Sequence, residues 1–64
     1  DEAIRRRVDQ IQKDPLRWPM SDDRHRRANI KGFPYSVIYR ILDQFVLIVA
    51  IAHTSRDTDY WKMN

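Results

Sequence analysis

Residues 33–53 of this 64-residue chain read FPYSVIYRILDQFVLIVAIAH, and the predicted architecture is built outward from them. From Tyr35 to Leu42, one face of an extended chain is more apolar than the other, as in a strand. Asp43-Gln44 is a plausible tight turn, and the continuous apolar run from Phe45 to Ala52 follows it. The stretch therefore predicts a hydrophobic hairpin, whose second strand is central and covered on both faces.

The first residues of the chain have the pattern of an amphipathic helix. The apolar positions that form its stripe are Ala3, Ile4, Val8 and Ile11. Pro15 disfavours helical geometry at Asp14, so the helix should end near that residue. A helix of about three turns is not stable alone in water, so we expect it to pack on the hairpin.

A loop and a third strand should connect the helix to the hairpin. Residues 14–23 contain two prolines and predict a loop, with Leu16 and Trp18 as its anchors to the core. The second half of the basic stretch 24–31 predicts a polar edge strand. The expected fold is therefore α+β, with one amphipathic helix packed on a three-stranded antiparallel β-meander in a single domain over residues 1–64.

Composition restricts the classes of partner and cofactor. Lys and Arg total 12 against nine Asp and Glu, a net charge of +3 that favours polyanions or an acidic protein partner. The longest apolar run is far shorter than the ~20 residues that span a bilayer, so we expect a cytoplasmic protein with no membrane contact. With no cysteine, two histidines and one glycine, no metal site and no cofactor is predicted.

The apolar run at residues 45–52 also has a consequence for assembly. One helix can cover only one face of the strand that this run predicts. We therefore expect a partner chain, or self-association, to cover the second face.

Groups capable of acid–base chemistry and anion binding follow the hairpin directly. In RNA cleavage, His53 could exchange protons, Tyr60 could orient or donate, and Arg56 could bind the phosphate. A structural alternative exists for each group. His53 at a strand end can cap backbone carbonyls, Arg56 can pair with a neighbouring carboxylate, and the aromatic rings of Tyr60 and Trp61 can close a small core.

The order of these segments resembles the RelE/ParE toxin superfamily, the bacterial plasmid-stabilisation toxins of type II toxin–antitoxin pairs. The residues that carry the resemblance are Phe33-Pro34-Tyr35, Tyr39, His53, Arg56, Tyr60 and Trp61. Members of that superfamily usually begin with a further strand and helix. The resemblance thus implies a toxin domain that lacks the first strand and first helix, truncated at its N-terminus.

The resemblance implies a growth-inhibiting toxin with one of two activities. ParE-like members bind and block DNA gyrase, whereas RelE-like members are ribosome-dependent mRNA endoribonucleases. Tyr60 and Arg56 match positions of the ribonuclease branch, but Ser36 and Thr54 stand where that branch generally has arginines. Gyrase inhibition is therefore favoured slightly, and an inactive decayed toxin fragment is a third alternative.

The resemblance also implies neutralisation by a cognate antitoxin with an acidic, amphipathic tail. We expect the tail to bind an apolar groove flanked by basic residues. The groove residues are Ile38, Leu42 and Ile48, and the flanking residues are Arg24, Arg26 and Arg40.

Overall fold

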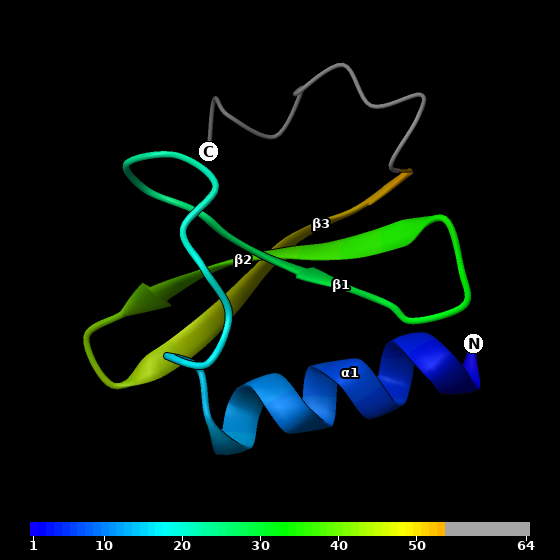
Figure 1. Ribbon diagram of the computed structural model, residues 1–64. Coiled ribbons are helices and arrows are strands. Elements are labelled where there is room, and N and C mark those ends of the chain that lie inside the picture. The colour runs from blue at the N-terminus through cyan, green and yellow to red at the C-terminus, as the bar shows by residue number, and fades with distance from the viewer. Residues whose placement is uncertain (54–64) are drawn as a thin grey trace.

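A computed structural model describes residues 1–53 of the chain and shows one helix lying across one face of a three-stranded sheet (Figure 1). The elements follow the order α1 (Glu2–Lys13), β1 (Arg26–Asn29), β2 (Tyr35–Leu42) and β3 (Phe45–His53). The strands are antiparallel, in the spatial order β1-β2-β3. The predicted α+β class, with one helix on a three-stranded meander, is confirmed.

The helix α1 begins and ends where its sequence predicts. The Asp1 carboxylate caps the first turn by accepting a hydrogen bond from the Ala3 amide at 2.8 Å. Asp14 leaves the helical region with φ of −151°, while its amide still bonds to the Gln10 carbonyl. Pro15 follows, and the clash of its ring with helical geometry at the preceding residue accounts for this end.

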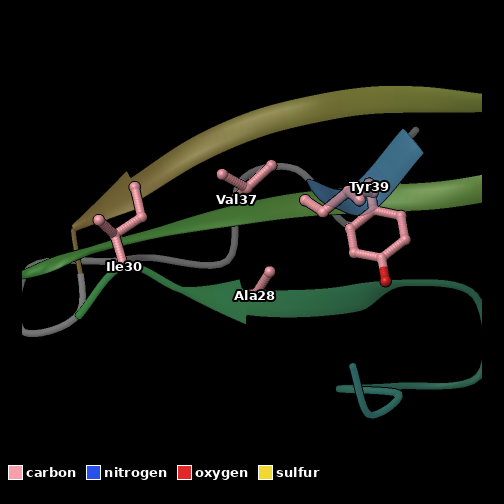
Figure 2. Packing of buried hydrophobic residues seen from close by; sticks show 5 residues of the cluster. Ala28, Ile30, Val37 and Tyr39 are labelled. Atoms are coloured by element: carbon pink, nitrogen blue, oxygen red, sulfur yellow. The ribbon is translucent and has the colours of Figure 1, made fainter. Parts of the chain in front are cut away.

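The core lies between α1 and the sheet. Its buried members are Ile11, Ala28, Ile30, Val37 and Tyr39, and Figure 2 shows those from the sheet side meeting in one layer. Burial of a side chain such as Ile11 stabilises the folded state by about 1.5–3 kcal/mol. The apolar face predicted for β2 does meet the helix through its middle, whereas Tyr35 and Ile41 at its two ends remain 39% and 37% exposed.

The loop after α1 is fixed to the sheet by one aromatic ring and one phenol. Trp18 packs against the core, and the guanidinium groups of Arg7 and Arg17 lie 5.2 and 5.0 Å from its ring centroid. Tyr39 Oη donates a hydrogen bond of 2.6 Å to the Pro15 carbonyl, and burial raises the pKa of this phenol. Leu16 was predicted as a second anchor, but that is wrong because its side chain is 69% exposed.

A β-bulge in β3 changes which side chains share a face. Tyr39 pairs with Ile48, whereas the adjacent Ile38 pairs with Ala50, so Val49 is an extra residue in the ladder. Ile48 consequently packs with the helix-side core, and Ala50 joins Ile38 on the opposite face. The prediction that Ile48 lines a groove together with Ile38 is therefore wrong.

Strand β3 also occupies a different position from the predicted one. Among the described strands it pairs only with β2, so it is an edge strand rather than the central one. On the face away from α1, Ile38 and Ala52 are fully buried. Phe45 and Leu47, nearer the hairpin turn, are exposed, Phe45 by 61%. The prediction of a partner or a second copy on this face therefore concerns the hairpin end alone.

The segment between Trp18 and β1 folds back along the outer edge of β1. The Pro19 carbonyl accepts a hydrogen bond from the Arg27 amide, and Met20 forms an isolated bridge with Arg26. Asp22 closes the turn, because its Oδ1 accepts hydrogen bonds of 2.8 Å from two successive amides, those of Arg24 and His25. This turn holds the basic residues near the end of β2.

Replacing Tyr39 by phenylalanine should lower the free energy of unfolding by about 1 kcal/mol, since the Pro15 carbonyl loses its buried donor. Urea unfolding measures the difference. Tyr35→Phe is the matched control, because Tyr35 is partly exposed and its ring contacts survive the change. Equal stability of the two variants would contradict the role given to the Tyr39 hydroxyl.

Acidification should destabilise the fold through Asp22. Hydrogen bonds led by the Arg24 amide lower the pKa of Asp22 from 3.8 to about 2 in the folded chain. The ionised carboxylate therefore stabilises the fold above pH 3.8, and this contribution disappears as the pH falls toward about 2. Asp22→Asn keeps the amide acceptor without the charge, so its unfolding free energy should fall less over this window.

The control for that experiment is Asp23→Asn, which should follow the wild-type pH profile. Unfolding in urea at several pH values separates the variants. Identical profiles for wild type and Asp22→Asn would show that the charge of Asp22 does not contribute.

Candidate functional site

The three predicted partner-binding arginines meet around one hollow near the end of β2, where β1 begins. This arginine hollow has a volume of about 330 Å³. It is lined by Met20, Asp23, Arg24, Arg26, Arg40 and Ile41. The structure thus gathers residues that are up to 21 positions apart in the sequence, from Met20 to Ile41.

The three guanidinium groups differ in how they are held. Arg26 is half-buried and donates a hydrogen bond of 2.6 Å to the Trp18 carbonyl, so it serves the fold as well as the hollow. Arg24 is exposed at the Asp22 turn, and Arg40 is half-buried on β2. In the described part of the chain, no ion pair joins Arg24 or Arg40 to a carboxylate. Two of the cations are therefore available to an anion.

The charge of the hollow is positive. Three guanidinium groups line it against the single carboxylate of Asp23. Arginine is the side chain best suited to bind carboxylates and phosphates, because its planar fork can donate two parallel hydrogen bonds. The hollow is therefore built to accept an anionic group from outside the described residues.

The apolar groove predicted beside these arginines does not form as one surface. Ile38 is fully buried and cannot contact a partner in this arrangement, and Ile48 lies on the helix side of the sheet. Leu42 remains, half-buried and opposite the exposed Phe45. Within the described residues, the apolar contact surface is thus restricted to the hairpin end of the sheet.

His53, the first of the predicted catalytic residues, lies at the opposite end of β2 from the arginine hollow. Its ring is half-buried and meets the ring of Tyr35 edge-to-face, with centroids 5.4 Å apart. Arg40 lies five residue steps along the strand from Tyr35, a distance of about 17 Å. The structure therefore does not bring His53 together with the arginines, while Arg56 and Tyr60 lie outside the described residues.

The resemblance to the RelE/ParE superfamily implies that Ser36 stands where the ribonuclease branch generally has an arginine. Its side chain is fully buried, and its hydroxyl donates a hydrogen bond of 2.5 Å to Asn29 Oδ1. The residue thus joins β1 to β2 beneath the surface. It cannot contact a phosphate of a bound nucleic acid.

A pairing of Asp22 with His25 was not predicted from the sequence. His25 Nδ1 lies 3.0 and 3.1 Å from the two carboxylate oxygens of Asp22, and the imidazole is fully buried. Its Nε2 has no hydrogen-bond partner in the described structure. The signal was present in Ser21-Asp22-Asp23 after Pro19, a run typical of turns closed by an aspartate side chain.

Residues 1–53 contain no cluster of three or more side chains of the kinds that hold a metal ion. No helix in this part of the chain has the length and hydrophobicity needed to cross a membrane.

The chain matches the model of a known protein family. The model described as "ParE toxin of type II toxin-antitoxin system, parDE" matches residues 1–58, which include α1 and all three strands. Comparisons with curated proteins and with solved structures give no match. Because the family model covers 58 of the 64 residues, the chain belongs to the ParE family of toxins from type II toxin–antitoxin systems.

Proposed function

We propose that this chain is a cytoplasmic toxin that blocks DNA gyrase by binding it, and that a cognate antitoxin neutralises it. Membership of the ParE family supports the toxin role and implies an antitoxin partner. The choice of gyrase over messenger RNA rests on the chemistry of the described residues.

The buried state of Ser36 is the observation that carries this choice. Cleavage of RNA by attack of a 2′-hydroxyl needs fixed positive charge at the phosphate, because negative charge develops there in the transition state. Where the ribonuclease branch has an arginine, this chain has a hydroxyl enclosed between two strands and bonded to Asn29. One cation that such a reaction needs is therefore missing.

The separation of His53 from the arginine hollow favours binding over cleavage in the same way. General acid–base catalysis requires the proton-transfer group and the phosphate-binding cations to surround one reacting centre. In the described residues, His53 pairs with Tyr35 at the start of β2, whereas Arg40 lies near the end of β2. The arginines therefore suit the recognition of a partner better than chemistry at His53.

The arginine hollow is the surface we assign to the antitoxin. An acidic segment would complement its three guanidinium groups, and Leu42 with the exposed Phe45 offers an apolar contact nearby. Charge complementarity of this kind speeds encounter and sets the register of binding, while buried apolar contacts supply most of the affinity.

Purified protein should inhibit supercoiling by DNA gyrase and leave ribosome-bound messenger RNA intact. The two assays are run side by side on wild type, Arg56→Ala and Tyr60→Phe. Cleavage of ribosome-bound RNA by wild type, lowered about tenfold or more in either variant, would instead establish the ribonuclease alternative. Inactivity in both assays would identify an inactive remnant.

Reversing the charge of Arg40 should slow association with the cognate antitoxin and weaken the dependence of that rate on salt. Arg40 has no ion pair with a described carboxylate, so Arg40→Glu breaks no such contact in the fold. Arg5→Glu on the exposed face of α1 is the matched control, with the same change in net charge. Stopped-flow association at several salt concentrations measures both. Equal rates for the two variants would remove the hollow from the interface.

A further inference from the structure

Next to the arginine hollow, no described residue pairs with the edge of β2. The ladder between β1 and β2 ends at the pair Arg26 and Tyr39, so no β1 residue lies opposite Ile41. In an antiparallel ladder, every second residue directs both its amide and its carbonyl toward the same neighbouring strand. The Ile30 amide donates to the Tyr35 carbonyl, which places residues 35, 37, 39 and 41 in the set that faces β1.

The amide and the carbonyl of Ile41 therefore point to the same side of β2 as β1, at a position that β1 does not reach. The chain preceding β1 turns away at the Asp22 turn instead of continuing along β2. Ile41 itself lines the arginine hollow that this divergence creates. One backbone donor, one backbone acceptor and three guanidinium groups thus border the same space.

We propose that an extended acidic segment of a partner chain adds to β2 at Ile41 as a short strand, on the same side of β2 as β1 and beyond Arg26, the first residue of β1. Its backbone pairs with the amide and carbonyl of Ile41, and carboxylates on the segment bind Arg40 and Arg24. Opposed residues of adjacent strands lie about 4.5–5.5 Å apart at Cβ, well within reach of an arginine side chain. The partner rests on the function proposed above, in which it is the antitoxin.

The chemistry of the hollow selects this occupant over others. The carboxylates of an acidic segment would neutralise the excess of three cations over one carboxylate. Its extended backbone would form hydrogen bonds with the amide and carbonyl of Ile41. Single-stranded nucleic acid would gain affinity by stacking its bases on aromatic rings. The side chains lining the hollow are aliphatic, thioether or charged, and none is aromatic.

The test is a titration of the full chain with a capped synthetic peptide of alternating Glu and Val, followed by NMR and amide hydrogen exchange. The Ile41 amide should shift and its exchange should slow. Arg40→Gln should weaken binding by about tenfold or more, as expected for loss of a charge-assisted hydrogen bond. Arg5→Gln should bind as wild type does.

Two further peptides separate the components of the site. A Gln and Val peptide should bind at least about tenfold more weakly, because it lacks the carboxylates. A peptide whose backbone nitrogens are methylated should also bind weakly, since it cannot pair with Ile41. Undiminished binding of the methylated peptide, or an unchanged Ile41 amide on binding, would overturn the strand addition.

Two other results would overturn the proposal as a whole. One is equal affinity for the Glu and Gln peptides. The other is a single-stranded RNA oligonucleotide that binds at Arg40 in preference to the Glu peptide. If the peptide binds but the protein does not inhibit gyrase, only the proposed target is refuted. If the protein inhibits gyrase but does not bind the peptide, only this site is refuted.

Discussion

Two cross-strand neighbours hold this small protein together, because they fasten the loop after the helix to the sheet. Tyr39 on β2 donates to the Pro15 carbonyl, and Arg26, its partner on β1, donates to the Trp18 carbonyl. The helix α1 is too short to be stable alone in water, so its position depends on this connection and on the core beneath it. The same loop leads directly to the Asp22 turn, so the arrangement of the arginine hollow follows from these two hydrogen bonds.

The basic residues around the hollow serve two different purposes. Arg26 serves the fold, because its guanidinium group donates a hydrogen bond to the Trp18 carbonyl. Among the described residues, Arg24 and Arg40 form no ion pair with a carboxylate, so their charge is open to an outside anion. The hollow therefore combines an excess of three guanidinium groups over one carboxylate with a β2 peptide group that no described strand pairs.

The sequence predicted the elements better than the surfaces. Helical spacing and Pro15 located α1, and the alternation in β2 identified the face that holds Val37 and Tyr39. The exposed position of Leu16 was not predictable, since the loop uses Trp18 and the Pro15 carbonyl instead. The predicted face of Ile48 was wrong because the face of a residue depends on the strand register. The residues of a uniformly apolar strand do not reveal that register.

The bulge at Val49 fixes which face of the sheet the last residue of β3, His53, occupies. Without the extra residue, His53 would lie on the face away from Tyr35. Insertions or deletions in β3 therefore keep His53 on the face of Tyr35 only when they come in pairs, and a single one must be offset by losing or doubling the bulge.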